Sequence, residues 1–185
     1  MRIIGGRARG LHLADVGEGD AKAHLRPTSD RVREAIFNLL INGGYGAPVD
    51  NARVLDLFAG TGALGLEAIS RGAAHATLVD DGPTALALQK RNIALMRTDA
   101  ATSLRRDATK LGPNPAAPFT LVFLDPPYGK ALGEKALASA IAGNWLTAEA
   151  LIIWEESAPP LIPPAFTQTD QRRYGDTLVT ILRAS

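Results

Sequence analysis

The sequence predicts an α/β fold in which helices cover a mostly parallel, seven-stranded sheet that ends in an antiparallel hairpin. From Arg53 onward, short β-branched or apolar runs alternate with helical stretches, which is typical of parallel strands joined by helical crossovers. The last two runs have only Gly175 between them as a clear turn residue, which indicates a hairpin. A length of 185 residues, 46% of them hydrophobic, suits one domain with a sizeable core.

Two elements are expected before this alternation begins. Residues 1–13 place short apolar runs on either side of a glycine pair and carry Arg2, Arg7 and Arg9 without an acidic residue. We therefore expect a β-hairpin with a cationic tip. The next periodic stretch, 28–42, predicts a helix with Thr28 as its cap, because apolar residues recur at helical spacing and glycines follow.

The alternation itself predicts five parallel strands, three helices and a closing hairpin. The parallel strands are expected at Val54–Phe58, Ala76–Asp80, Thr102–Arg105, Phe119–Asp125 and Ala150–Glu155. The helices are expected at Gly62–Arg71, Pro83–Met96 and Lys130–Ala142. The strands of the hairpin are expected at Phe166–Tyr174 and Thr177–Leu182.

Composition excludes several classes of chemistry. The chain has no cysteine, which rules out disulfides, thiolate zinc sites and mechanisms that begin with a Cys nucleophile. His12, His24 and His75 lack ligand spacing, so we expect no metal. The formal net charge of +1 is too small to indicate nucleic acid by itself. No apolar leader and no run near the ~20 residues of a membrane helix are present, so we expect a cytoplasmic protein without a membrane partner.

A glycine-rich turn follows the first strand of the alternation. Gly60, Gly62 and Gly65 stand between a strand and a helix, where backbone can approach a ligand closely. With Asp80 at the end of the next strand, the spacing formally satisfies the dinucleotide fingerprint. The turn therefore predicts a site for a nucleotide-like molecule.

The charge at this turn favours a cationic ligand over a dinucleotide. Asp56, inside the strand, would repel a pyrophosphate on the turn and attract a cation. S-adenosyl-L-methionine carries a sulfonium and an ammonium but no phosphate, so it is the expected cofactor, with Asp80 at its ribose. Phe58 and Ala59 complete the predicted contacts of the turn with the cofactor.

A further cofactor contact is predicted after the third strand. Asp107 and Ala108 stand where enzymes that use this cofactor commonly place an acid and a backbone N–H against adenine. These two residues are assigned by positional analogy alone. For Asp107, a solvated loop acid or a helix cap is nearly as good an interpretation.

The fourth strand ends in a motif that suits an exocyclic amine: Asp125, Pro126, Pro127 and Tyr128. It lies at the carboxyl edge of the predicted sheet, where α/β folds bind ligands. The lone pair of such an amine is delocalised into the base until acceptors hold its hydrogens. Asp125 can accept one N–H and the carbonyl of Pro126 the other. Pro127 stiffens the turn, and Tyr128 can stack on a flipped base.

Four segments together resemble the bacterial 16S ribosomal RNA guanine-N2 methyltransferases of the RsmD type. They are residues 2–6, 26–38, 55–68 and 173–177. The resemblance implies one domain, 1–185, with a Rossmann-like class I S-adenosylmethionine-dependent methyltransferase fold. It comprises an N-terminal hairpin extension at 1–27 and a catalytic core at 28–185.

The resemblance also implies a reaction and a substrate. The enzyme would methylate the N2 amine of one guanine in 16S rRNA, usually within an assembled or partly assembled small ribosomal subunit. Carried over to this sequence, the guanine would be held by Asp125, Pro126 and Tyr128. The cofactor would be held by Asp56, Gly60, Gly62 and Asp80.

Basic residues at the N-terminal end support an RNA partner. The first 33 residues carry seven Lys plus Arg against four acids, or +3, on a chain whose total is +1. Arg2, Arg7 and Arg9 are the better candidates for RNA contact. Arg26 and Arg31 are further candidates, although Arg26 can pack over the cofactor site and Arg31 can orient a neighbouring acid.

Two other functions remain open. An adenine-N6 methyltransferase of DNA or RNA shares the amine-binding motif, but it normally needs an additional target-recognition region. A non-catalytic RNA-binding factor for ribosome assembly would keep the fold without the reaction. Nothing in the sequence marks a dimer surface, so we expect a monomer.

Overall fold

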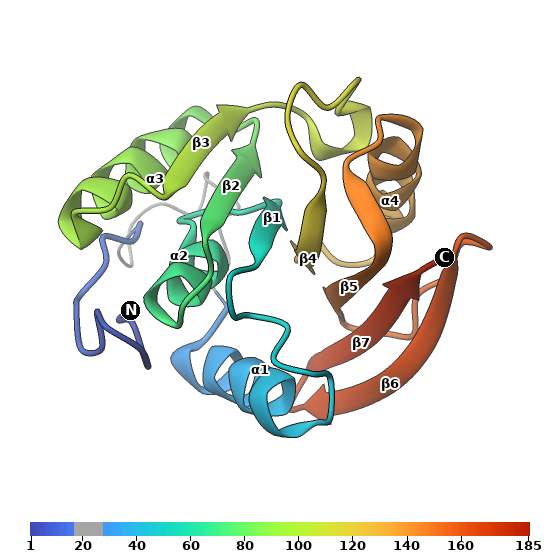
Figure 1. The fold of residues 1–185 in the computed structure, drawn as a ribbon, viewed down its shortest axis with the longest axis horizontal. Coiled ribbons are helices and arrows are strands. Elements are labelled where there is room, and N and C mark those ends of the chain that lie inside the picture. The colour runs from blue at the N-terminus through green and yellow to red at the C-terminus, as the bar shows by residue number, and fades with distance from the viewer. Residues whose placement is uncertain (17–27) are drawn as a thin grey trace.

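The computed structural model describes residues 1–16 and 28–185, and its strands form one seven-stranded sheet (Figure 1). The strand order is β3-β2-β1-β4-β5-β7-β6. The strands are β1 (Arg53–Leu57), β2 (His75–Asp80), β3 (Ala101–Arg105), β4 (Phe119–Leu124), β5 (Leu146–Glu156), β6 (Phe166–Tyr174) and β7 (Thr177–Ala184). β1 to β5 run parallel, and β7 is antiparallel to β5 and β6. The predicted α/β class and its closing hairpin are confirmed.

Helices cover both faces of this sheet. They are α1 (Asp30–Asn42), α2 (Ala63–Ser70), α3 (Pro83–Met96), α4 (Leu132–Ala142) and the short 3₁₀ helix η1 (Ala108–Lys110). Side chains alternate along a strand, so Val54 of β1 packs in one apolar cluster with α1 and α2, whereas Leu55 packs in the other with α4. The result is a three-layer arrangement. In the described ranges, no helix combines the length and the apolar character that a membrane crossing needs.

Predicted and observed bounds of the central elements differ by at most two residues, except at β5. That strand begins at Leu146, four residues before the expected Ala150. Its first residues pair with β4 across an irregularity that follows Phe119. Ala148 and Glu149 are exposed there, so the start of β5 lacks the apolar run from which a buried strand is predicted.

The cap of α1 is Ser29, so the predicted cap at Thr28 was wrong by one residue. The Ser29 Oγ accepts the N–H of Val32 at 3.2 Å, as an N-cap side chain does. Both residue types suit a cap, and the sequence alone does not distinguish two neighbours. The consequence is functional, because Thr28 is free of the capping role and lines a cavity instead.

The N-terminal segment reverses direction as predicted, but it contains one isolated bridge, between Arg2 and His12, in place of regular strands. Its turn lies against the C-terminal end of α2, where the Ser70 carbonyl accepts the N–H of Arg7 at 2.8 Å. A Cβ at Gly6, where φ is 76°, would lie 1.9 Å from that carbonyl oxygen, so only glycine permits this approach. The rest of the predicted extension, 17–27, lies outside the described residues.

Candidate active site

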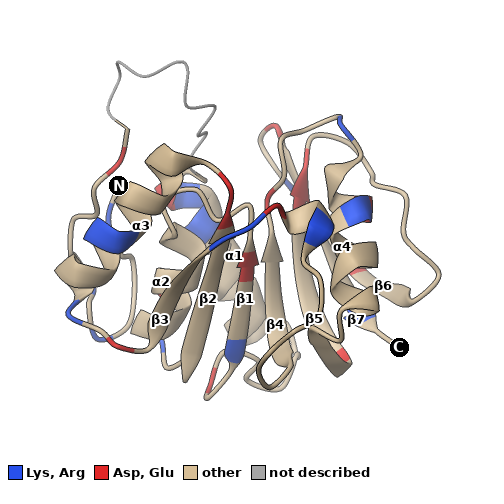
Figure 2. Cartoon of the chain, turned by 90° about the horizontal axis from the view of Figure 1, so that it is seen from above, with Lys and Arg blue, Asp and Glu red and all other residues tan. Residues whose placement is uncertain are grey.

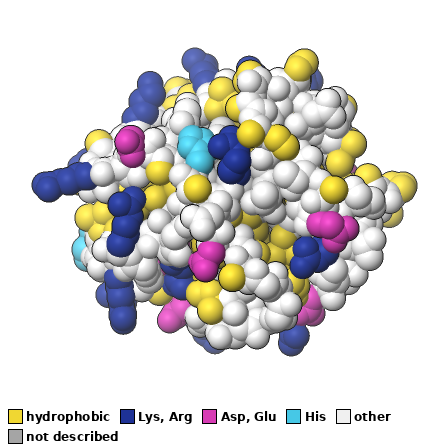
Figure 3. Space-filling view, in the orientation of Figure 1, with side chains coloured by type: hydrophobic (Ala, Val, Ile, Leu, Met, Phe, Trp, Pro, Cys, Tyr) yellow, Lys and Arg dark blue, Asp and Glu magenta, His cyan; other side chains and the backbone are white. Residues whose placement is uncertain are grey.

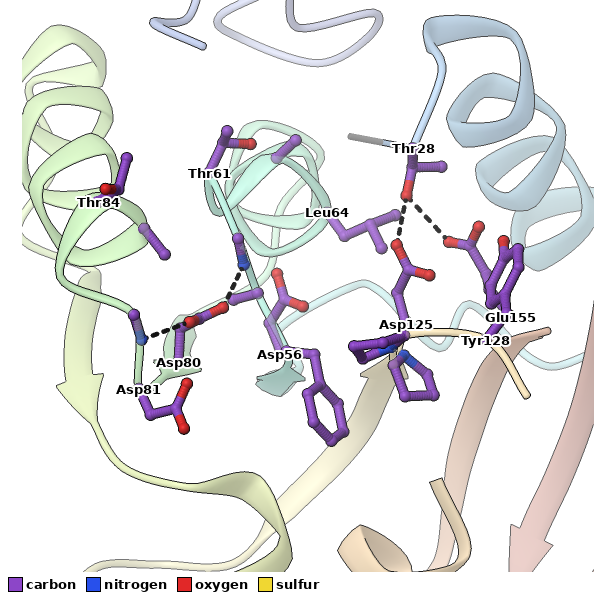
Figure 4. A pocket seen from close by; sticks show the side chains of 18 of the residues that line it. Thr28, Asp56, Thr61, Leu64, Asp80, Asp81, Thr84, Asp125, Tyr128 and Glu155 are labelled. Atoms are coloured by element: carbon purple, nitrogen blue, oxygen red, sulfur yellow. Dashed lines mark hydrogen bonds between the residues drawn. The ribbon is translucent and has the colours of Figure 1, made fainter. Parts of the chain in front are cut away.

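A cavity of about 670 Å³ opens at the carboxyl edge of the sheet (Figure 4). Acidic residues are concentrated at this edge, toward which the central strands point (Figure 2). The lining of the cavity includes nine of the predicted site residues: Asp56, Phe58, Ala59, Gly60, Asp80, Asp125, Pro126, Pro127 and Tyr128. The volume suits an organic ligand. Apart from Gly62, which is not part of the lining, the predicted cofactor residues of the glycine turn share one cavity with the predicted amine-binding residues.

The loop after β1 carries backbone strain. Phe58, the first residue after the strand, has φ 58°, a conformation that bulky side chains rarely adopt. Gly60 and Gly62 also have positive φ, at 54° and 82°. The N–H of Ala59 anchors the loop to β2 through the carbonyl of Val79, at 2.9 Å. Strain of this kind concentrates at ligand sites, and this loop lines the cavity.

Asp80 secures the same loop from the end of β2. Its carboxylate accepts the N–H of Gly60 at 2.9 Å and the N–H of Gly82 at 2.9 Å (Figure 4). Burial raises the pKa of Asp80, against the effect of these two hydrogen bonds. Because each carboxylate oxygen has a second lone pair, Asp80 can accept from a ligand hydroxyl while it holds the turn.

Asp56 brings a buried carboxyl group to the floor of the cavity. It is 1% exposed and accepts the N–H of Gly65, in the first turn of α2, at 2.8 Å. Burial raises the pKa of Asp56 to about 8, and the charges of Asp125 and Asp80 add to this effect. Gly65 itself serves close packing, because a Cβ there would lie 2.4 Å from the Leu78 side chain. A bound cation would relieve the electrostatic cost of ionising Asp56.

Two polar residues of α3 support the glycine loop, and sequence reasoning missed both. Gln89 and Asn92 are fully buried. Their side-chain amides donate to the carbonyls of Gly60 and Thr61, each at 3.0 Å. Asn92 also accepts the N–H of Ala14, which ties the N-terminal segment to the loop. The sequence did contain a sign of this role, because Gln89 and Asn92 are two amide side chains one turn apart on the inner face of a predicted helix.

The motif after β4 faces the cavity from the other side. Pro126 is buried, whereas Asp125 and Tyr128 are partly exposed. The Tyr128 hydroxyl lies 3.4 Å from the Thr177 hydroxyl at the start of β7. The N–H of Gly129 lies 3.3 Å from Glu156, so β5 and β7 hold the turn in place.

Thr28 and Glu155 complete this side of the cavity, and sequence reasoning missed both. The Thr28 hydroxyl lies 3.1 Å from Asp125 Oδ2 and 3.2 Å from Glu155 Oε1 (Figure 4). Glu155 is 2% exposed. A signal existed for Glu155, because β4 and β5 were predicted to be parallel strands and an acid ends each of them. The pairing of Leu124 with Trp154 confirms that the two acids follow neighbouring positions.

The predicted adenine contact is not part of this cavity's lining, which lacks both Asp107 and Ala108. Asp107 caps η1, because its carboxylate accepts the N–H of Thr109 at 2.8 Å and the Thr109 hydroxyl at 2.7 Å. The bond from this hydroxyl lowers the pKa of Asp107. Ala108 is buried in the apolar cluster beneath α4. The structure thus shows Asp107 as a helix cap, which was one of the alternatives that the sequence left open.

Among the described residues, none of the predicted RNA-binding arginines lines the cavity. Arg7 donates to Thr98, between α3 and β3, at 3.3 Å, so the cationic turn lies at the amino edge of the parallel strands. Arg2, Arg7, Arg9 and Arg31 are exposed, and Arg26 lies outside the described residues. Figure 3 shows Lys and Arg side chains gathered over the side of the molecule formed by the N-terminal segment and α3.

No group of three His, Asp or Glu side chains that could hold a metal ion is found within 1–16 and 28–185. The acids of the cavity therefore do not form a cluster of metal-ligand type. Their partners are backbone N–H groups at Asp56 and Asp80 and a hydroxyl at Glu155.

Comparisons with known proteins match nearly the whole chain. A family model described as "Conserved hypothetical protein 95" matches residues 1–183. The chain is 40% identical over 167 residues to ribosomal RNA small subunit methyltransferase D of Escherichia coli K12, covering 88% of this chain and 79% of the relative. The Haemophilus influenzae protein of the same name is 36% identical over 170 residues, covering 89% of this chain and 83% of the relative.

A solved structure shows the same architecture over the whole length. The Escherichia coli protein described as "Putative methyltransferase yhhF" superposes with a TM-score of 0.81 at 34% identity. The match covers 100% of this chain and 97% of that one. The sheet order and the arrangement of helices are therefore those of a known architecture.

Proposed function

The chain belongs to the family described as conserved hypothetical protein 95, and we propose that it methylates the N2 amine of a guanine in 16S rRNA, with S-adenosyl-L-methionine as methyl donor. The relatives named ribosomal RNA small subunit methyltransferase D support the substrate class, since the chain aligns with most of their length. One observation carries the proposal: a single cavity joins the acid-rich glycine loop to the motif at Asp125–Tyr128.

The residues at the glycine loop fit this cofactor. Ionised Asp56 would attract a sulfonium or an ammonium, and its pKa near 8 reflects a site that gains from a cation. Asp80 has acceptor capacity for ribose hydroxyls beyond its two backbone bonds. Phe58, Ala59 and Gly60 offer a strained backbone turn for close approach. When bound, S-adenosylmethionine supplies an electrophilic methyl group on a cationic sulfur.

The motif after β4 orients the amine. Asp125 accepts one N–H of the guanine amine and the carbonyl of Pro126 accepts the other, so the nitrogen lone pair points at the methyl group. Pro127 has no N–H to compete for these acceptors and fixes the turn. Tyr128, held beside Thr177, stacks on the flipped base. Positioning of this kind accounts for ~7–11 kcal/mol of barrier reduction in well-oriented reactions.

The substrate is the assembled or partly assembled small subunit, met in the cytoplasm by a monomer. The cavity opens at the carboxyl edge of the sheet. The exposed arginines of the N-terminal segment supply phosphate contacts elsewhere on the surface. Recognition of the particle would thus be separated from recognition of the base.

The proposal is tested by methyl transfer with labelled cofactor. Small-subunit particles that lack native modification are incubated with the protein and methyl-labelled S-adenosylmethionine, and we expect label in the RNA. S-adenosylhomocysteine at 100 times its Kd should stabilise the protein by ~2.7 kcal/mol and raise the Tm, whereas NAD should not. If the RNA gains no label and S-adenosylhomocysteine does not raise the Tm, the result would favour the non-catalytic assembly factor.

A further inference from the structure

A buried carboxyl group stands behind the amine-binding motif. Glu155, near the end of β5, is 2% exposed. Its bond runs to the hydroxyl of Thr28, 3.2 Å away. The same hydroxyl lies 3.1 Å from Asp125 Oδ2. Thr28 therefore bridges the buried acid to the acid that meets the amine.

The number of protons available in this bridge determines which group donates to which. A threonine hydroxyl has one proton to donate and two lone pairs to accept with. It therefore cannot donate to both carboxylates at once. Both short contacts are satisfied if one carboxyl is protonated and donates to Thr28 while the hydroxyl donates to the other.

The surroundings select Glu155 as the protonated partner. Burial raises the pKa of Glu155 well above its usual value, and the charges of Asp125 and Asp56 raise it further. The groups that oppose this are the Thr28 hydroxyl and the guanidinium of Arg33 on α1. Asp125 lies at the cavity surface and is partly exposed, which favours its ionised form over that of Glu155.

We propose that Glu155 is a positioning residue that stays protonated and acts through the Thr28 hydroxyl to hold Asp125 as a carboxylate oriented toward the target amine. The inference rests on the proposed methylation and names the residues that prepare its acceptor. Glu155 donates to Thr28, and Thr28 donates to Oδ2 of Asp125, which lines the cavity. A single negative charge is thereby kept beside the amine.

The transfer step balances without a proton from Glu155. The nitrogen lone pair forms the new N–C bond, and the electron pair of the breaking C–S bond stays on sulfur. The proton lost by the amine goes to Asp125, which releases it to solvent after the product leaves. Glu155 is unchanged throughout, in contrast to a relay, in which an ionised Glu155 would take up the proton.

The experiment compares isosteric and conservative variants at both ends of the bridge. Glu155→Gln keeps a neutral donor to Thr28, so we expect kcat within about threefold of wild type and an extended alkaline plateau of kcat. Glu155→Leu and Thr28→Val should each lower kcat about 10- to 100-fold, with KM for the particle unchanged. Thr28→Ser should retain activity. Glu149→Gln, an exposed charge change on the same strand, serves as the control.

A second measurement does not depend on turnover. In infrared difference spectra of the full chain with S-adenosylhomocysteine, titrated from neutral to alkaline pH, wild type should show a protonated carboxyl band that Glu155→Gln lacks and that Thr28→Val shifts. The proposal is overturned if that band is absent, if Glu155→Gln is as slow as Glu155→Leu, or if Thr28→Val matches wild type. An inactive wild type that keeps the band would instead reject the proposed methylation.

Discussion

At the residue scale, three carboxyl groups that line one cavity differ in their surroundings. Asp56 is buried against the first turn of α2, and Asp80 holds two backbone N–H groups of the loops around it. Asp125 is partly exposed beside a hydroxyl. In the proposed function, the first two hold the cofactor and the third accepts from the amine. Substitutions should therefore separate cofactor binding from turnover.

Asp125→Ala and Asp80→Ala test that separation. Asp125→Ala should lower kcat by at least about 100-fold while the Kd for S-adenosylhomocysteine changes little, because the amine loses a charged acceptor. Asp80→Ala should instead weaken cofactor binding, because the proposed ribose contact and the observed anchor of Gly60 are both lost. Calorimetric titration and single-turnover rates measure the two effects. Normal turnover in Asp125→Ala would remove that carboxylate from the mechanism.

Asp56→Asn tests the charge on the cavity floor. The folded protein raises the pKa of Asp56 from 3.8 to about 8, so between these values the folded state keeps a proton that the unfolded state has released. Asp56 thus contributes stability below pH ~4 that is lost as the pH rises through ~8. The Asn side chain keeps an acceptor for the N–H of Gly65 but does not ionise. The Tm of Asp56→Asn, relative to wild type, should therefore increase with pH. S-adenosylmethionine should bind wild type more tightly as the pH rises, but not the variant.

Parallel melting curves and titrations from about pH 5 to about pH 9 measure both effects. S-adenosylhomocysteine, which lacks the sulfonium, should show a weaker dependence of affinity on pH than S-adenosylmethionine. A difference in Tm between Asp56→Asn and wild type that stays constant over this range would contradict the assignment.

At the scale of elements, one buried side chain joins the N-terminal segment to the helices. Glu67 of α2 is fully buried and accepts the N–H groups of Ile4 and Gly5 at 2.9 and 2.8 Å. It also pairs with Arg71 at 2.8 Å and with buried Arg33 of α1 at 3.4 Å. Three elements therefore depend on one carboxylate.

Glu67→Ala should lower the free energy of unfolding by about 3–5 kcal/mol, because the charge of Arg33 stays buried with less compensation. Thermal and urea unfolding measure the change, and the exposed Glu34→Ala on α1 is the matched control. Equal stability of the two variants would show that Glu67 does not organise this junction.

The same scale shows what the sequence can and cannot predict. The central elements were predictable because buried parallel strands read as apolar runs, and the loop glycines mark a turn with positive φ. Thr28 was assigned to a cap because the local pattern fits, whereas its real partners are about 100 residues away or more. Glu155 was overlooked because an acid at a strand end usually meets solvent. Such long-range pairs are set by tertiary packing.

At the scale of the whole molecule, the arginine-rich turn and the cavity lie at opposite edges of the sheet. Arg7 and Arg9 are at the turn of the N-terminal segment, and Arg7 contacts Thr98 at the amino edge of the strands. A substrate that touches both regions must extend along the side formed by α2, α3 and the N-terminal segment (Figures 1 and 3). A folded RNA particle meets this requirement more readily than a short single strand.

Arg7→Ala combined with Arg9→Ala should weaken particle binding without changing kcat at saturation. If both contact phosphates, the slope of log affinity against log salt should fall by about 1.4–1.8. Equilibrium binding at several salt concentrations measures it. Arg172→Ala removes one exposed positive charge at the far edge of the sheet, in β6, and should leave the slope unchanged. Identical slopes for all three proteins would place the RNA elsewhere.

The most direct test of the whole account is the chemical identity of the product. Small-subunit particles lacking native modification are treated with wild type or Asp125→Ala and S-adenosylmethionine, and the RNA is digested for nucleoside mass spectrometry. The account predicts N2-methylguanosine at a single site with wild type and a greatly reduced amount with Asp125→Ala. N6-methyladenosine, or no methylated nucleoside from particles and naked RNA alike, would contradict it.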